Sequence, residues 1–402
     1  IMANVSSSNG LEKRPKLRFP GFDKPWKVFK AEELFQNITD KNHPDETVLT
    51  IIQGKGTLPR EQAGRNIHYD DASLSNYKKV EQGDFIIHLR SFEGGLEMAN
   101  EAGIVSPAYT ILRCKRPHSS LFYDAYFHTD EFINHNLSKS VEGIRDGRQI
   151  SYEAFKWLGI PYCEPTEQEK ISNLFAALNE RIAKQRDLIE ALKKYKRGVV
   201  RILLSPKHCS IKNVKWTTSR IGDIGTFIKG APLSKADISL EGTPFILYGE
   251  LYTTYSEVIS NVVRKTQASV DKQYYSQIGD VIIPTSGETP EEISTASCVM
   301  LPDIILAGDL NIYRCTQVDG RIMSYILNHV VNDRIARIAQ GKSIVHVQAA
   351  EISKIEITYP DSFSQKTIIA ILAAISDRID QSNAELRLLY ELRKALLQKL
   401  FI

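Results

Sequence analysis

The sequence has few of the patterns that would assign a function at once. Its five cysteines form no Cys-x-x-Cys pair and leave an odd one over, so they predict reduced cytoplasmic thiols rather than disulfides or a zinc site. The longest apolar runs, such as residues 368–375, are too short to cross a bilayer. The net charge of +3 neither requires nor excludes a nucleic-acid ligand. The 402 residues, 42 % of them hydrophobic, suffice for two or three globular domains.

Motifs that mark catalytic sites are also missing. The sequence has no His-Glu-x-x-His pair, no Gly-x-Ser-x-Gly elbow, and no Asn- or Asp-Pro-Pro-Tyr run of the kind that amino-methyltransferases use. Residues 340–343 end like a phosphate-binding loop, but Ala336 occupies the position where that motif needs its first glycine. These absences favour a protein that is not an enzyme and carries no metal site.

An internal repeat organises the chain. Residues 167–204 place apolar side chains three and four positions apart, which predicts a long helix with one buried face. The same pattern returns at residues 365–402, where Gln365 repeats Gln168 (365 − 168 = 197) and Ile379 repeats Ile182. A repeat of about half the chain, with each copy ending in a long helix, predicts two related units.

The segments before the two helices also correspond. Runs typical of strands occur at residues 47–52, 83–89 and 104–113, and a helix is expected near residues 119–137. Gly-Asp-Phe-Ile-Ile at 83–87 is matched by Gly-Asp-Val-Ile-Ile at 279–283. The loops between these runs differ between the halves, which is typical of one frame carrying two recognition surfaces. A duplicated enzyme domain with diverged loops remains the alternative.

Basic, hydroxyl and aromatic residues gather in those loops. Such side chains contact phosphates and base edges in protein–DNA complexes, although each alone is also an ordinary solvated loop residue. The predicted DNA-binding residues are Lys55, Arg60, Arg65, Arg90, Ser91, Phe92, Lys229, Ser234, Lys235, Tyr248, Tyr252, Thr285, Ser286 and Lys342.

The order of motifs along the chain resembles a known family. Leu-Arg-Phe-Pro-Gly-Phe at 17–22, Leu-Arg-Ser-Phe-Glu-Gly-Gly at 89–95, the run at 103–113 and Glu-Gln-Glu-Lys-Ile at 167–171 together resemble the specificity subunit of type I restriction-modification systems. The resemblance covers the chain from Pro15 onward. The second unit departs from it, because it has Phe-Ser-Gln-Lys-Thr-Ile at the start of its helix and no clear Ser-Pro-Ala-Tyr.

The resemblance implies an α+β fold. It would consist of two mixed α/β target recognition domains, separated by two long antiparallel, coiled-coil-like helices and related by a pseudo-twofold axis. The expected segments are a tail or expression remnant at 1–16, recognition domains at 17–164 and 206–359, and spacer helices at 165–205 and 360–402.

The resemblance also implies partners. The chain would read both halves of a bipartite site in double-stranded DNA, and two modification subunits would dock on its helices. Restriction subunits, which are ATP-dependent translocases and nucleases, would join them. No cofactor would bind this chain, since S-adenosylmethionine, ATP and magnesium belong to the partner subunits. The complex would work in the bacterial cytoplasm.

The two helices are expected to pack along one apolar seam. Gln185 and Ser382 interrupt it with polar side chains, which either fix the alignment of the helices or lie at a solvated edge. A basic cluster at residues 193–201 is expected on the outer face, toward solvent or a partner. The predicted seam residues are Ile171, Leu174, Leu178, Ile182, Ile189, Leu192, Ile368, Ile375, Ile379, Leu386, Leu389 and Leu396.

Two other functions stay open at this point. A self-contained nuclease with an unrecognised active site would cleave DNA without any other subunit. A coiled-coil assembly factor would bind proteins and not DNA, although the basic and aromatic loops argue against it.

Overall fold

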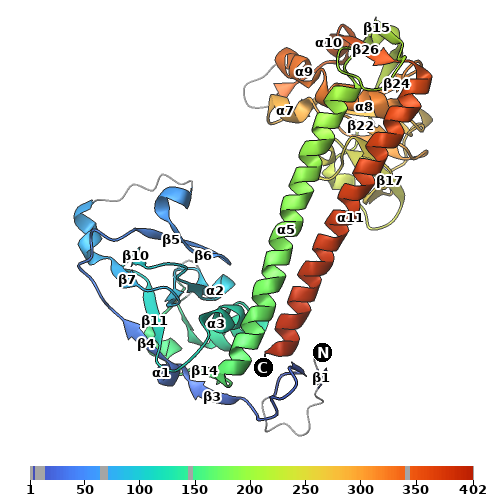
Figure 1. Ribbon diagram of the computed structural model, residues 1–402. Coiled ribbons are helices and arrows are strands. Elements are labelled where there is room, and N and C mark those ends of the chain that lie inside the picture. The colour runs from blue at the N-terminus through green and yellow to red at the C-terminus, as the bar shows by residue number, and fades with distance from the viewer. Residues whose placement is uncertain (1–2, 5–13, 64–70, 144–147, 340–344, 402) are drawn as a thin grey trace. The chain divides into compact units, whose positions relative to one another are not determined.

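The computed structural model describes residues 3–4, 14–63, 71–143, 148–339 and 345–401 (Figure 1). The chain divides into two compact units. Unit 1 comprises residues 1–186 and 384–402, and unit 2 comprises residues 187–383. Each unit therefore contains one part of both long helices, and each is described here by itself.

Unit 1 is built on a four-stranded antiparallel sheet in the order β4-β11-β8-β9. A hairpin, β5–β6, and three further strand pairs, β7–β10, β3–β14 and β12–β13, surround it. The strands are β3 (Lys27–Lys30), β4 (Phe35–Ile38), β5 (Leu49–Ile52), β6 (Gly56–Pro59), β7 (Lys78–Val80), β8 (Phe85–Ile87), β9 (Glu97–Met98), β10 (Gly103–Val105), β11 (Thr110–Cys114), β12 (Val141–Glu142), β13 (Gln149–Ile150) and β14 (Gly159–Tyr162). A short pair, β1 (Ala3–Asn4) with β2 (Leu17–Arg18), precedes them. The helices before the long one are α1 (Ala31–Leu34), α2 (Ser91–Gly94), α3 (Ser120–Phe127) and α4 (Tyr152–Phe155).

Aromatic side chains form the core of unit 1. Phe35 and Phe85 from the sheet meet Tyr123 and Phe127 from α3, and the Phe85 and Phe127 ring centroids lie 4.9 Å apart. Such edge-to-face contacts add to the area that large rings bury. The predicted helix at 119–137 is only partly regular, since α3 ends at Phe127 and a π-helical turn follows at Glu131–Asn136.

Unit 2 repeats this plan with a longer sheet, β16-β24-β20-β22-β18. A three-stranded sheet, β19-β17-β23, and the pairs β15–β26 and β21–β25 complete its body. The strands are β15 (Trp216–Arg220), β16 (Gly225–Lys229), β17 (Thr243–Leu247), β18 (Val258–Ile259), β19 (Arg264–Thr266), β20 (Asp280–Pro284), β21 (Ser286–Gly287), β22 (Ser297–Val299), β23 (Ile305–Ala307), β24 (Leu310–Cys315), β25 (Val345–His346) and β26 (Glu356–Pro360). The shorter helices are α6 (Glu250–Thr253), α7 (Pro290–Ile293), α8 (Gly320–His329), α9 (Asn332–Ile338) and α10 (Ala349–Ser353).

The repeat extends to individual hydrogen bonds. In unit 1 the buried Asp84 carboxylate accepts from Arg113, with Nε 2.8 Å from Oδ1. In unit 2 Asp280, also buried, accepts from Arg314 at 3.1 Å. The two pairs join equivalent strands, so the predicted duplication is present at the level of side-chain chemistry.

The amide at the start of each long helix repeats in the same way. Gln168 accepts from Ser119 N and donates to Cys163 O, both at 2.9 Å. Gln365 accepts from Asp319 N and donates to Pro360 O, both at 2.8 Å. Each glutamine is buried, so it ties its helix to the body of its own unit.

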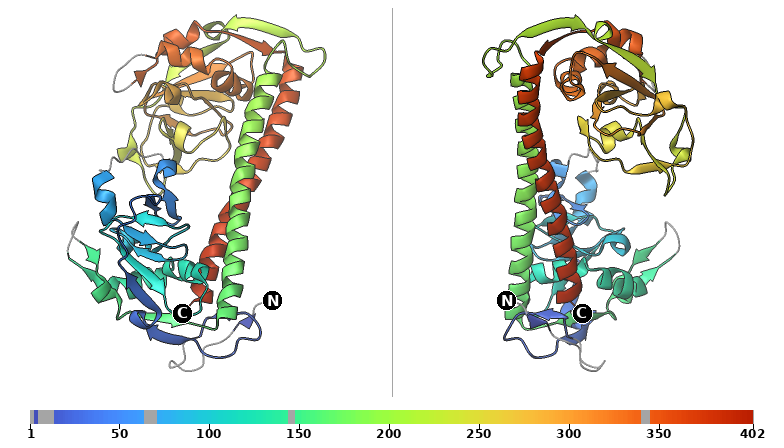
Figure 2. Two further views of the ribbon diagram at one scale, coloured as in Figure 1. Left: turned by 60° about the vertical axis from the view of Figure 1, so that its left-hand side comes forward. Right: turned by 90° about the vertical axis from the view of Figure 1, so that its right-hand side faces the viewer.

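The long helices are α5 (Pro165–Leu203) and α11 (Ser362–Leu400), each of 39 residues. In unit 1 the start of α5 lies beside the end of α11, with the Phe175 ring stacked on Phe401 and Arg393 Nε 2.9 Å from Asn179 Oδ1 (Figures 1 and 2). In unit 2 Val200 and Leu203 of α5 share a core with Ile368 of α11. Early residues of one helix meet late residues of the other, so the helices are antiparallel within each unit.

The seam residues predicted from the sequence lie on the packed side of both helices. Ile171, Leu178, Ile182, Ile189, Ile368 and Ile379 are buried, and the six other seam residues are partly buried. Gln185 and Ser382 are also buried, with 3 % and 2 % of their surfaces exposed. A solvated edge for these two side chains is therefore wrong. Phe175, Leu372 and Leu397 belong to the buried face too and were not predicted.

One local expectation differs from the structure. The run at 104–113 is two strands, because Ser106–Tyr109 form a turn between β10 and β11. Helix α5 begins at Pro165, and Gln168 N donates to Glu164 O. Proline is favoured in the first turn, where its missing N–H costs nothing. All five cysteines are unpaired thiols. Within the described ranges, no helix combines the length and apolarity needed to span a membrane.

Candidate nucleic-acid interface

In unit 1 the first predicted DNA-binding residue, Lys55, lies in the turn of the β5–β6 hairpin. Lys55 stands at its tip, exposed, and its N–H donates to Ile52 O at 2.9 Å. Gly54 and Gly56 flank it with φ of 73° and 78°. Glycine adopts this left-handed conformation without the steric cost that other residues have. The sequence Gly-Lys-Gly thus holds one lysine out on a tight turn.

The β8–α2 turn carries the next predicted group. Arg90 is exposed beside Leu89, which is 64 % exposed. Ser91 is fully buried, and its hydroxyl accepts from His88 N at 2.8 Å, so it bonds the backbone of its own turn, and its contact with DNA stays a prediction. Phe92 is partly buried under Arg148, whose guanidinium carbon lies 4.2 Å from the ring centroid. Arg148 was not predicted, because it lies far along the chain.

Arg60 follows strand β6 and is partly buried near Tyr109. Burial raises the pKa of the Tyr109 phenol, and the positive charge of Arg60 partly offsets that rise. Arg65 lies outside the described residues. Unit 1 thus presents Lys55 and Arg90 near one another, because the side chain of Gln53 in the hairpin turn packs against Gly94, the last residue of helix α2 that follows Arg90.

In unit 2 most of the predicted residues line one open cavity of about 1320 Å³. Among its lining residues are Lys229, Ser234, Lys235, Tyr248, Tyr252 and Ser286, all six of which were predicted. The loops that carry them are separated in sequence by up to 57 residues (286 − 229), so the fold brings them together. Thr285 precedes Ser286 and is partly buried, whereas Lys342 lies outside the described residues.

Local hydrogen bonds fix the lysine loop of this cavity. Ser234 Oγ accepts from Ala236 N at 3.2 Å, and Asp237 Oδ2 accepts from Ser234 N at 2.7 Å. This reciprocal cap orders a single 3₁₀ turn and leaves Lys235 exposed. Ser286 is buried instead, and its hydroxyl donates to Asp309 Oδ2 at 2.9 Å. Ser286 therefore supports the wall of the cavity, and its direct contact with DNA stays a prediction.

Charge in the cavity is mixed, but most of the acidic groups are engaged. Glu250 is buried and accepts from Arg264 Nε and from Leu247 N, each at 3.1 Å. Asp309 accepts from Ser286. The exposed Lys229 and Lys235 thus supply cations to a wall that also carries the Tyr248 and Tyr252 rings, 6.4 Å apart. This combination suits a phosphate backbone with stacked or hydrogen-bonded bases.

Sequence reasoning missed three cavity residues, Arg264, Tyr274 and His346. Arg264 follows an apolar pair, and Tyr274 lies in a polar run, so neither stands in a turn motif. His346 reaches the cavity because β25 pairs with β21. Only the pairing of distant strands identifies these residues.

The basic cluster on α5 also needs one correction. Lys196 was expected on the outer face, but it is 8 % exposed and its Nζ lies 2.7 Å from Glu257 Oε2. His329 Nε2 lies 2.7 Å from the other oxygen of Glu257. Burial alone would raise the pKa of Glu257, but the bonds with His329 and Lys196 lower it to about 2. Lys193, Lys194, Arg197 and Arg201 are exposed as expected.

No group of three or more metal-ligating side chains occurs among the residues that the structure describes. The predicted basic residues of units 1 and 2 lie instead on loops of two related frames. Such an arrangement defines a class of protein: a duplicated α+β frame that carries two unlike sets of loops.

Comparison with known proteins identifies that class more closely. Residues 213–389 match the type I restriction modification DNA specificity domain. The S subunit of a type I restriction-modification system from M. genitalium has a similar fold, with a TM-score of 0.56 and 16 % identity over 96 % of this chain and 99 % of that chain. A structure described as the basis of complex assembly and conformational transition of the type I restriction-modification system gives a TM-score of 0.59 and 15 % identity, over 94 % of this chain and 98 % of that chain. No curated protein matches the sequence.

Residues 213–389 are therefore similar in sequence to a type I DNA specificity domain, and the resemblance to specificity subunits predicted from the sequence is confirmed for this part of the chain. The predicted α+β fold class is confirmed as well, with a long helix between two mixed bodies.

Proposed function

We propose that this chain is the DNA-recognition subunit of a type I restriction-modification complex, and that each unit reads one half of a bipartite, asymmetric site. The observation that carries the proposal is a repeated frame with unlike cationic loops. The hydrogen-bonded pairs Asp84–Arg113 and Asp280–Arg314 recur, whereas the described loops differ: unit 1 presents Lys55 on a Gly-Lys-Gly turn, and unit 2 forms an open cavity. Two different surfaces on one frame suit two different half-sites.

The chain itself is non-catalytic in this proposal. Methylation of adenine would be carried out by modification subunits that bind S-adenosylmethionine, and cleavage by restriction subunits that use ATP and magnesium. The bacterial cytoplasm, where the target DNA lies, would be the working compartment.

The outer face of α5 supports docking of a partner helix. Leu188, Ala191, Tyr195, Gly198 and Ile202 are spaced three and four residues apart, as in a coiled-coil seam, and all five are exposed. Tyr195 is 61 % exposed. A continuous apolar stripe in water is unfavourable unless a partner covers it.

The same positions recur on α11. Leu388 matches Ala191 and Leu392 matches Tyr195 (388 − 191 = 197 and 392 − 195 = 197), and the two leucines are 64 % and 49 % exposed. Equivalent apolar faces on the two helices support two copies of one partner. We propose that two modification subunits dock there, one on each helix.

The decisive experiment for recognition is methylation mapping in a host that carries this subunit with its modification subunits. A bipartite adenine-methylated sequence is expected. Exchanging residues 18–160 for the first domain of another specificity subunit should change one half-site and leave the other intact. No methylated motif, or a change in both halves, would contradict the proposal.

The docking proposal has its own test. Tyr195→Glu places a charge in the α5 stripe, and Leu392→Glu does the same on α11, so each variant should lose one of two modification subunits in mass measurement of the complex. The double variant should lose both. Lys194→Glu, beside the stripe, is the matched control and should leave two. Two bound subunits in the double variant would exclude this surface.

The length of the long helices supports a spacer function. A 39-residue helix rises about 58 Å at about 1.5 Å per residue. Inserting four residues, about one turn, after Gln185 should lengthen the unread segment between the half-sites and keep both half-sites. An unchanged segment would count against helices that set the spacing.

The nuclease alternative is tested with the purified chain alone. DNA cleavage or methylation without any other subunit would favour an enzyme over a recognition scaffold.

A further inference from the structure

Glu97, on strand β9 of unit 1, is a buried carboxylate that serves the turn of Lys55. Its side chain is fully buried, and its two oxygens bond the backbone of that turn. Oε1 accepts from Gly54 N at 2.6 Å, and Oε2 accepts from Gly56 N at 2.8 Å. One carboxylate therefore holds the backbone on both sides of Lys55.

A second residue holds the same turn from the other direction. Asn100 Nδ2 donates to Lys55 O at 2.7 Å and to Thr57 O at 2.9 Å. Asn100 N donates to Thr57 Oγ1 at 3.0 Å. The fit is close, because a Cβ added to Gly56 would lie 2.5 Å from Met98 O. The backbone of Lys55 is thus fixed while its side chain stays exposed.

The hydrogen bonds made by Glu97 and Asn100, here called the clamp, also determine which groups of the turn can bind a ligand. Successive N–H groups in a tight turn form a natural anion site. Here Glu97 already occupies the N–H groups of Gly54 and Gly56, so a phosphate cannot take them. The group left to meet an anion is the Lys55 ammonium, on a stem whose base is immobilised.

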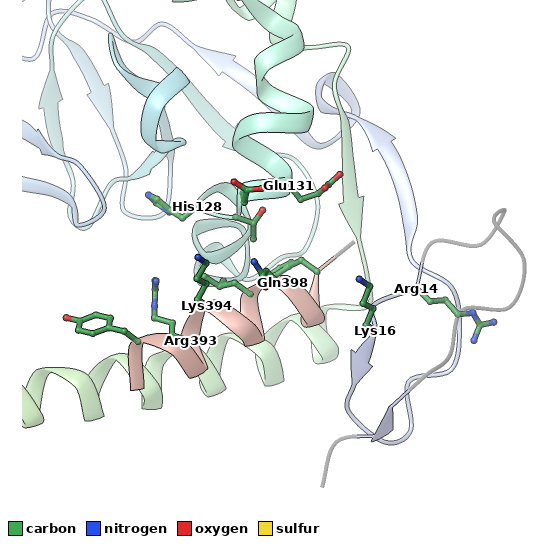
Figure 3. Close-up of a pocket in the computed structure, with 12 residues that line it drawn as sticks. Arg14, Lys16, His128, Glu131, Arg393, Lys394 and Gln398 are labelled. Atoms are coloured by element: carbon green, nitrogen blue, oxygen red, sulfur yellow. The ribbon is translucent and has the colours of Figure 1, made fainter. Parts of the chain in front are cut away.

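His128 also contacts the Glu97 carboxylate and helps to orient it. Its Nε2 lies 3.3 Å from Glu97 Oε1, and its Nδ1 lies 2.7 Å from Asp124 O. His128 stands at the wall of a cavity of about 850 Å³, across from Arg393 and Lys394 of α11 (Figure 3). Burial opposes ionisation of Glu97, but its bonds from His128, Gly54 and Gly56 lower the pKa below its ordinary value. Glu97 is therefore an anion with three donors.

We propose that Glu97, together with Asn100, is a positioning residue that fixes Lys55 for contact with a DNA phosphate of the half-site read by unit 1. The proposal rests on the proposed DNA-recognition function. It assigns to Glu97 a role in binding that follows from two backbone bonds and not from contact with DNA.

The test is a double-mutant cycle on the full chain in complex with its modification subunits. Binding is measured to a duplex carrying the methylated sequence found by mapping, over a series of salt concentrations. Glu97→Gln keeps the shape but turns an N–H₂ group toward one of the two turn N–H groups. Lys55→Ala removes the ammonium.

Each single variant should bind about five- to tenfold more weakly and lower the salt slope by about one, as expected for one lost phosphate contact. The double variant should match the single variants, because Glu97 acts through Lys55. The matched control is Lys235→Ala in unit 2, whose effect should multiply with that of Glu97→Gln. If Glu97→Gln does not fold, Asn100→Ala takes its place in the same cycle, since it frees Lys55 O.

The outcomes separate the two proposals. A wild-type complex that does not distinguish its duplex from a scrambled one would overturn DNA recognition itself. Selective wild-type binding with no loss in Glu97→Gln, or with none in Lys55→Ala, would overturn only the positioning role. Effects of Glu97→Gln and Lys55→Ala that multiply would also overturn it, because independent effects mean that the carboxylate does not act through the lysine.

Discussion

Units 1 and 2 repeat the hydrogen bonds that join their elements but not those that shape their surfaces. The Asp84–Arg113 pair recurs as Asp280–Arg314, because the strands that these pairs join must meet in both units. The carboxylate that shapes the candidate surface does not recur. Glu97 holds a hairpin turn, whereas Glu250 holds Leu247 N and Arg264 in the cavity wall. A duplicated frame is thus constrained by its internal bonds, and its loops are free to differ.

The start of the long helix shows a second difference. In unit 1 Glu167 is buried, accepts from both Arg18 Nε at 2.6 Å and Arg18 Nη2 at 2.8 Å, and also accepts from Trp26 Nε1. Ser364 occupies the equivalent position in unit 2 (364 − 167 = 197) and donates to Asp361 Oδ2 at 2.9 Å. Unit 1 thus fixes its helix with a buried ion pair, whereas in unit 2 the Asp361 carboxylate caps the helix without a paired arginine.

The largest expected effect comes from making unit 1 resemble unit 2 at this position. Glu167→Ser leaves the Arg18 guanidinium buried without its counter-charge, which should reduce stability by about 3–5 kcal/mol. Ser364→Ala, the matched change in unit 2, should cost about 1 kcal/mol. Denaturant unfolding of both variants measures the difference. Adding Arg18→Met to Glu167→Ser should restore much of the stability; no recovery would mean that the charge is not the cause.

The next largest effect is expected at Lys196 of α5, which is buried in unit 2, whereas the equivalent residue of α11, Arg393 in unit 1, is only partly buried. Lys196→Met should reduce stability by about 2–4 kcal/mol, because the partly buried Glu257 loses its cationic Lys196 partner and keeps His329. Arg393, at the equivalent position (393 − 196 = 197), bonds the exposed Asn179, so Arg393→Met should cost under about 1 kcal/mol. Equal losses in the two variants would contradict this assignment.

The Glu257 site also predicts a pH dependence. Its pKa is lowered from 4.5 to about 2 in the folded chain, so its stabilising contribution is present above about pH 4.5 and is lost as the pH falls toward 2. Lys196→Met should raise that pKa and reduce the loss of stability over this range. Melting temperatures of wild type and variant measured from pH 6 to pH 3 give the comparison. Parallel curves would exclude the pair as the cause.

The shared frame predicts matched effects. Asp84→Asn and Asp280→Asn each replace a buried carboxylate that accepts a hydrogen bond from an arginine. Each substitution should reduce stability by about 2 kcal/mol. The comparison between the two is the measurement, made by denaturant unfolding. Costs that differ by more than about 1.5 kcal/mol, well beyond ordinary context dependence of such bonds, would show that the two pairs are not equivalent.

The smallest expected effects are on the candidate surfaces. Arg90→Ala in unit 1 and Lys235→Ala in unit 2 should each lower the salt slope of DNA binding by about one without changing the methylated sequence, if both contact phosphates. Stability should not change, since both side chains are exposed. A change of the methylated sequence in either variant would instead assign that side chain to a base edge.

Periodicity predicted the repeat and the long helices, because the face of an amphipathic helix is written into the spacing of its apolar residues. The predicted seam lies on the packed side for this reason. The burial of the polar residues Lys196, Gln185 and Ser382 could not be predicted from spacing, since it depends on what packs against the helices. Spacing gives the face of a residue but not its partner.

The candidate surfaces were predictable by residue type and not by orientation. Lys55, Lys229 and Lys235 are exposed as a loop lysine should be. Ser91 and Ser286 are turned inward, because a hydroxyl next to a tight turn bonds the backbone or a carboxylate of that turn as readily as it faces water.

The sequence by itself determined the duplication, the two long helices and the family resemblance, since all of these are patterns along the chain. Only the tertiary structure decided that Glu97 bonds the backbone of the Lys55 turn, that the unit 2 loops share one cavity and that Lys196 forms a buried ion pair. Glu97 and Gly56 are 41 positions apart and Lys196 and Glu257 are 61 apart, and the approach of such groups is fixed by the pairing of strands and the packing of helices.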